Sequence, residues 1–142
     1  MRKSALVLAL LATVVALPAA QAAVTAYKGT LSGATEVPPV QTAGTGSAAV
    51  NVDTGTKQAS WRVEYSGLSG APTAAHIHCG AAAGANAGVA VSLGAASTLA
   101  SPIQGSGAMT DAQLADLQAG KCYVNIHTDK NKGGEVRAQL AP

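Results

Sequence analysis

The residues best suited to chemistry lie in two short segments of this 142-residue chain. Together the segments hold every histidine and cysteine of the sequence: His76, His78 and Cys79 in the first, and Cys122 and His127 in the second. Imidazole is a ligand for both copper and zinc, and two cysteines in an exported chain favour a disulfide over free thiols. The segments therefore predict a Cys79–Cys122 disulfide beside either a metal site or a polar strand face.

Strand periodicity separates the two residue types. Side chains alternate between the faces of a strand, so Cys79 shares a face with Ile77, and Cys122 shares one with Val124 and Ile126. All three histidines then fall on the opposite face. If the two segments pair antiparallel with His76 opposite His127, the three imidazoles lie about 5 to 8 Å apart and can converge on one ion.

That register makes the predicted disulfide harder to form. It places Cys79 and Cys122 diagonally, at the outer limit of the separation that a disulfide bridges. Three alternatives stay open at this point: a bulge between the segments, cysteines beyond the strand ends, or a less compact group of histidines. Ligation of a metal by free thiolates is disfavoured, because the cysteines point away from the histidines.

Three other charged residues are candidates for binding. Glu135 and Arg137 share a face of a later strand, which predicts a solvated ion pair or, for Arg137, a site that guides anions. Glu36 precedes Val37-Pro38-Pro39 in a loop and is expected to be solvated. The serines and threonines show no nucleophile elbow, which argues against nucleophilic hydrolysis.

The elements that must position these residues are short strands. Apolar and polar residues alternate over 48–52, 60–66, 89–93 and 136–140 and, more weakly, over 27–31, with clusters of turn residues between them. One helix is predicted after Thr110, with Gln113 completing a capping box and Gly120 ending the helix. We expect an all-β fold, an antiparallel Greek-key β-sandwich with one short helix.

The first 22 residues read as an export signal, with a basic start, an apolar stretch and a small-residue cleavage site. Residues 23–142 would then form one domain. Removing Arg2 and Lys3 from nine basic residues leaves seven against seven acidic ones, and this neutrality argues against nucleic-acid binding. No later segment is apolar and long enough to span a bilayer, so we expect a soluble periplasmic or secreted protein.

Six motifs, in order, resemble the CHRD domain, the family named after chordin: residues 31–40, 67–70, 76–80, 117–120, 123–128 and 133–140. The resemblance implies a secreted β-sandwich module. Ala138 replaces a glycine often found in the last motif, and the two cysteines imply a disulfide-bearing subgroup.

A more distant similarity is to copper-zinc superoxide dismutase. It implies that His76, His78 and His127 are metal ligands and that Arg137 guides the anion. Three histidines cannot supply the two metal sites of that enzyme, so at most one ion is expected.

Three functions follow from these patterns. The first is a binding module that holds one copper or zinc ion through the three histidines. The second is a mononuclear enzyme similar to superoxide dismutase, although the neutral charge offers no steering field. The third is a metal-free adhesive or structural module whose polar face meets a protein partner outside the cytoplasm.

Overall fold

The computed structural model describes residues 23–142. Eight strands and one α-helix follow one another along the chain: β1 (Val24–Ser32), β2 (Thr45–Asp53), β3 (Gln58–Ser66), β4 (Pro72–Cys79), β5 (Val89–Ser92), β6 (Ile103–Ala108), α1 (Asp111–Gln118), β7 (Cys122–Thr128) and β8 (Val136–Gln139). Two short 3₁₀ helices, η1 (Gly33–Thr35) and η2 (Ala96–Thr98), follow β1 and β5. The predicted all-β fold with a single short helix is confirmed.

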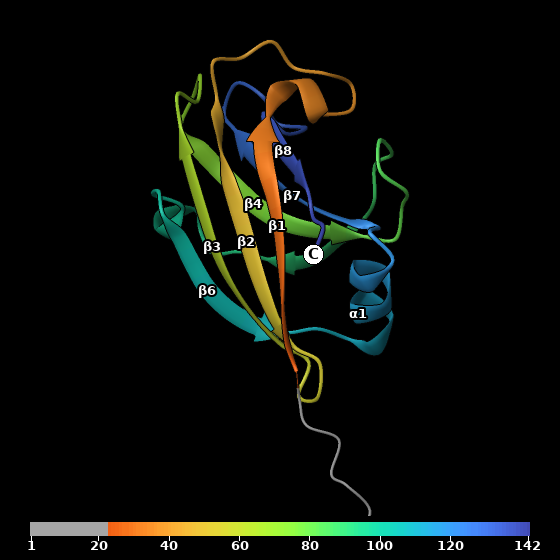
Figure 1. The fold of residues 1–142 in the computed structure, drawn as a ribbon. Coiled ribbons are helices and arrows are strands. Elements are labelled where there is room, and N and C mark those ends of the chain that lie inside the picture. The colour runs from red at the N-terminus through yellow and green to blue at the C-terminus, as the bar shows by residue number, and fades with distance from the viewer. Residues whose placement is uncertain (1–22) are drawn as a thin grey trace, which may run out of the picture.

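The strands form one antiparallel sheet in the order β5-β4-β7-β8-β1-β2-β3-β6. The sheet is joined most weakly between β1 and β8, where Ser32 pairs with Arg137 and Lys28 forms a bridge to Ala141. At this joint the sheet folds over itself, so that β4 and β7 cross behind β1, β2 and β3 (Figure 1). The two histidine segments lie in β4 and β7, which pair directly, although their cysteines are 43 positions apart in the sequence.

One core fills the space between the two halves of the sheet. Inward-facing residues of β2 and β3, such as Val50 and Val63, are fully buried with Ile77 of β4 and Val124 of β7. Trp61 links the halves further, because its indole Nε1 donates a hydrogen bond to the Leu93 carbonyl at 3.2 Å. Alternation with period two produces this arrangement, since it gives every strand an apolar face.

The capping box predicted for the helix is present. Thr110 accepts a hydrogen bond from the Gln113 amide, and the Gln113 side chain accepts one from the Thr110 amide. Gly120 has a φ of 70°, which suits the left-handed end of a helix. Strand β6 was not predicted, because its glycines and serines lack an apolar alternation.

Within residues 23–142, no helix is long and apolar enough to cross a membrane. The predicted export signal, residues 1–22, lies outside the described residues.

Candidate metal centre

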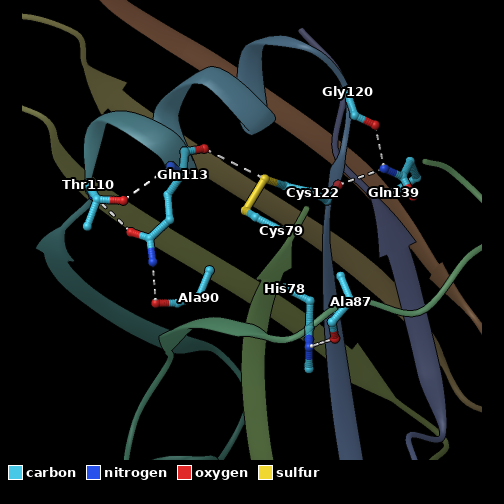
Figure 2. The surroundings of a disulfide bond; sticks show 9 residues. All are labelled: His78, Cys79, Ala87, Ala90, Thr110, Gln113, Gly120, Cys122 and Gln139. Atoms are coloured by element: carbon cyan, nitrogen blue, oxygen red, sulfur yellow. Dashed lines mark hydrogen bonds between the residues drawn. A yellow bond between two sulfur atoms is a disulfide. The ribbon is translucent and has the colours of Figure 1, made fainter. Parts of the chain in front are cut away.

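The register of β4 against β7 resolves the alternatives left by the sequence. Cys79 lies directly opposite Cys122, and the two form the predicted disulfide. The register drawn from the sequence was wrong by two residues, because His76 faces Asn125 and His127 faces Ala74. Figure 2 shows the disulfide joining the ends of β4 and β7 beneath α1. The crosslink therefore fixes the register of the strands that carry the histidines.

The three histidines still converge. Each offers one ring nitrogen, and these nitrogens all lie within 4.8 Å of one another. The shortest separation, 3.2 Å, joins His76 Nδ1 and His127 Nε2. Two zinc–nitrogen bonds of about 2 Å at a tetrahedral angle place the ligand nitrogens about 3.3 Å apart. His76 and His127 thus already have the spacing of a ligand pair.

The hydrogen bonds of His127 define its tautomer. Its Nδ1 lies 2.9 Å from the Lys132 carbonyl oxygen, which can only accept, so Nδ1 carries the proton. The Nε2 atom then presents its lone pair to His76, whose Nδ1 donates. A backbone carbonyl behind a histidine is a common way of orienting a metal ligand. An ion between the rings would take the place of the His76 proton.

His78 is held more tightly than the other two. It is 7% exposed, whereas His76 and His127 are half-buried. Its Nδ1 lies 2.9 Å from the Ala87 carbonyl, a contact visible in Figure 2, and its Nε2 lies 3.0 Å from the Asn125 side-chain oxygen. Both partner atoms are acceptors and a neutral imidazole carries one N–H, so a neutral His78 donates a single hydrogen bond, to either Ala87 or Asn125. His78 can join a metal only when Asn125 releases it.

The surroundings of the cluster favour neutral imidazoles. Burial lowers the pKa of His76, and the neighbouring His127 and His78 lower that pKa further. Burial also lowers the pKa of His78, against the raising effect of its hydrogen bond to Ala87. Metal binding requires an uncharged imidazole, and the lowered pKa values keep both rings uncharged at neutral pH.

A stack of side chains continues from His78 away from the cluster. The rings of His78 and Tyr123 lie 4.8 Å apart and almost parallel, and Arg137 Cζ lies 3.4 Å from the centre of the Tyr123 ring. Arg137 donates hydrogen bonds to the Asn86 side chain and the Ala85 carbonyl and is 1% exposed. Arg137 is therefore connected to the histidines through Tyr123 rather than by direct contact.

Glu135 and Arg137 do not form the solvated pair that their spacing predicts. Both are buried, because loops cover this face of β8. The Glu135 carboxylate instead accepts hydrogen bonds from four side chains and one backbone amide: Thr42 Oγ1, Ser69 Oγ, Thr128 Oγ1, Asn131 Nδ2 and Ser69 N. Burial would raise the pKa of Glu135, but these hydrogen bonds outweigh burial and lower the pKa to about 2.

The expectation that Glu36 is solvated is also wrong. The segment after η1 turns its carboxyl group inward, and the residue is 5% exposed. Burial raises the pKa of Glu36 to about 7, although the Arg137 charge, the Asn125 side chain and the Val37 amide lower it. The Asn125 amide lies beside this carboxyl without the geometry of a full hydrogen bond to its Oε1 atom.

The sequence missed the groups that support the histidines. Asn125 and Tyr123 alternate with His127 on the same face of β7, so strand parity placed them beside the cluster without assigning them a role. The carbonyl groups of Ala87 and Lys132 leave no signal in a sequence, because every residue has the same backbone carbonyl acceptor, whatever its side chain.

Comparison with known proteins gives one match. A family model described as the CHRD domain matches residues 27–140, a range that includes the three histidines and both cysteines. No curated protein matches the chain, and no solved structure matches it.

Proposed function

The chain belongs to the CHRD domain family, and from that premise we propose that it is an exported binding module holding one copper or zinc ion through His76, His78 and His127. The observation that carries the proposal is the convergence of one ring nitrogen from each histidine within 4.8 Å. Imidazole ligands suit both metals, and three histidines leave a fourth position for water or for a ligand from a partner protein.

Two features support export. A disulfide joins Cys79 and Cys122, and such bonds persist in oxidising compartments outside the cytoplasm. Residues 1–22 have the composition of a cleaved signal. We therefore place the module in the periplasm or outside the cell.

The test is a metal titration of residues 23–142 without an affinity tag. We expect one copper or zinc ion to bind per chain, and each single replacement His76→Ala, His78→Ala or His127→Ala to weaken binding by about tenfold or more. The matched control is Arg62→Gln, an exposed strand residue outside the cluster. Equal binding by the wild type and a variant lacking all three histidines would overturn the proposal.

One observation favours a metal-free module as the second candidate. Five of the six ring nitrogens already have a hydrogen-bonding partner without any ion, His76 Nε2 being the exception. In that case the histidines form a polar face that meets a protein partner, and no stoichiometric metal binds. The dismutase alternative receives no support from Arg137, since the proposed anion guide is buried and engaged by Asn86 and Ala85.

A further inference from the structure

Asn125 is a buried polar side chain at the histidine cluster that the three-histidine site does not use. It lies directly opposite His76 in the pairing of β4 with β7, and strand parity puts its side chain on the same face of β7 as that of His127. It is 3% exposed, and its Oδ1 atom lies 3.0 Å from Nε2 of His78. A buried amide oxygen therefore lies beside the ring nitrogens of the cluster.

The contact between His78 and Asn125 joins two acceptors when the ring proton is on Nδ1. That atom lies 2.9 Å from the Ala87 carbonyl oxygen, and the Nδ1 proton of His127 is held against the Lys132 carbonyl in the same way. The lone pair of His78 Nε2 then faces the Asn125 oxygen. Two lone pairs at this distance repel each other unless a positive group lies between them. This pair of atoms therefore favours a cation.

Exchanging the oxygen and nitrogen of the Asn125 amide would remove the repulsion, but Glu36 opposes the exchange. Glu36 Oε1 and Asn125 Nδ2 both lie within 2.6 Å of the position that a Cβ atom would take at Gly134. Burial raises the pKa of Glu36 to about 7, and the Arg137 charge and the Asn125 side chain both lower it. An amide lowers a carboxyl pKa by donating from its nitrogen. The nitrogen therefore stays towards Glu36, and the oxygen faces the cluster.

Two pairs of atoms now have the spacing of metal ligands. His76 Nδ1 and His127 Nε2 are 3.2 Å apart, and His78 Nε2 and Asn125 Oδ1 are 3.0 Å apart. Two ligands at about 2 Å from one ion and at a tetrahedral angle are about 3.3 Å apart. Amide oxygens ligate divalent cations in proteins. Three imidazoles and one amide oxygen therefore supply the four ligands of a tetrahedral ion.

We propose that Asn125 Oδ1 is the fourth ligand of the ion and closes the site. The inference rests on the proposed function, because it assigns a further ligand to the same metal centre. The ion takes the place of the hydrogen bond between His78 and Asn125, and Glu36 orients the amide from behind. Sites with four protein ligands hold a metal, whereas catalytic sites keep one position open. Asn125 therefore makes this centre a binding site rather than a catalytic one.

The test uses cobalt(II) as the probe, because cobalt takes the tetrahedral sites of zinc and its visible absorption changes when a ligand is gained or lost. Residues 23–142, without an affinity tag, receive one equivalent of cobalt. The pH is about 8.5, above the pKa of about 7 of Glu36, so that this carboxyl group is ionised. Azide, a small anion that binds to an open position on cobalt, is then titrated. Zinc affinity is measured by competition with cobalt.

Four variants accompany the wild type. Asn125→Ala removes the proposed ligand, and Asn125→Leu removes it while keeping most of the side-chain volume. Asn51→Ala is the matched control, since Asn51 is an exposed asparagine of β2. A variant lacking all three histidines shows whether cobalt binds elsewhere. Circular dichroism confirms that each variant is folded.

We expect azide to leave the cobalt spectra of the wild type and Asn51→Ala unchanged. Both Asn125 variants should bind cobalt and zinc about tenfold or more weakly, and their cobalt spectra should change with azide. Spectra of folded Asn125 variants that ignore azide would overturn the inference, because another group would then close the site. A histidine-dependent spectrum that responds to azide in the wild type would overturn the inference alone and leave the proposed function standing. Absence of cobalt and zinc binding by the wild type would overturn both.

Nuclear magnetic resonance of the wild type provides a measurement that needs no variant. One equivalent of zinc should shift the side-chain carbonyl carbon of Asn125 and leave that of Asn51 unchanged. An Asn125 signal that stays in place while the histidine ring signals shift would show that the histidines hold the ion without the amide. That outcome would overturn the inference and uphold the proposed function.

Discussion

At the scale of single residues, the histidines are supported by groups that hold them neutral and oriented. Lys132 fixes the tautomer of His127, and Ala87 and Asn125 hold the ring of His78. These contacts give His127 and His76 the spacing of metal ligands and leave His78 dependent on Asn125. The cluster thus consists of a close pair, His76 and His127, with His78 held beside it.

The lowered pKa values of His76 and His78 predict how metal affinity varies with pH. Protons compete with a metal for the ring nitrogens, and here the competition begins below the ordinary histidine pKa of 6.5. Zinc affinity should therefore change little between about pH 8 and about pH 6.5 and should fall at lower pH. Zinc titrations at half-unit intervals of pH measure this. A steep loss of affinity above pH 6.5 would contradict the prediction.

Glu135 should contribute strongly to stability. Replacing it by Gln removes a buried carboxylate that accepts five hydrogen bonds, and we expect Glu135→Gln to lower the free energy of unfolding by about 2 to 4 kcal/mol. Its pKa of about 2 lies below the ordinary 4.5, so its contribution is complete above pH 4.5 and is lost as pH falls towards 2.

Urea unfolding at neutral pH and at about pH 3 tests both parts of this prediction. Glu64→Gln serves as the control, because that carboxylate is half-exposed and should change stability little. A Glu135→Gln variant as stable as the control at neutral pH would show that the carboxylate is not needed.

At the scale of elements, the turn between β7 and β8 connects the histidine cluster with Glu36. Gly134 ends this turn with a φ of 126°, a conformation that L side chains rarely adopt. A Cβ atom there would lie 2.5 Å from Glu36 Oε1 and 2.6 Å from Asn125 Nδ2. Gly134 therefore lets the turn approach the two side chains closely enough to cover them.

We expect Gly134→Ala to lower the free energy of unfolding by about 2 to 4 kcal/mol, through backbone strain and through these two close contacts. Gly133→Ala is the matched control, because a Cβ atom at Gly133 would meet no atom within 4 Å. Urea unfolding of both variants gives the comparison. Equal stability of the two would show that the turn can move without cost.

At the scale of the whole molecule, the two halves of the folded sheet share one hydrophobic core. The sheet folds over at the joint between β1 and β8, and Trp61 and the disulfide add connections at other places. A crosslink that closes a loop of about 44 residues stabilises a chain by about 3 to 4 kcal/mol in the chain-entropy description. This contribution matters because alanine and valine supply much of the core.

A single core predicts cooperative unfolding. Trp61, the only tryptophan, lies in this core, so its fluorescence and the far-ultraviolet circular dichroism of the sheet should change at the same urea concentration. Both signals are recorded on residues 23–142 with the disulfide intact. Two separate midpoints would show that the halves of the sheet unfold independently.

The sequence by itself determined the features that depend on local periodicity and on residue chemistry. Alternation predicted most of the strands, and Thr110, Gln113 and Gly120 predicted the limits of the helix. Parity placed the histidines on one face and the cysteines on the other, and the counting of cysteines predicted their disulfide. These features follow from a strand having two faces and from two thiols having one available partner.

Only the tertiary structure decided the features that depend on what covers a face. The sequence predicted that Glu36, Glu135 and Arg137 are solvated, and loops from distant parts of the chain bury all three. With Cys79 opposite Cys122, His76 lies opposite Asn125, and His78 contacts the Asn125 side chain of β7 and the Ala87 carbonyl of the loop before β5. Periodicity shows which face a side chain occupies, but the partners on that face depend on the register between strands and on the packing of loops over them.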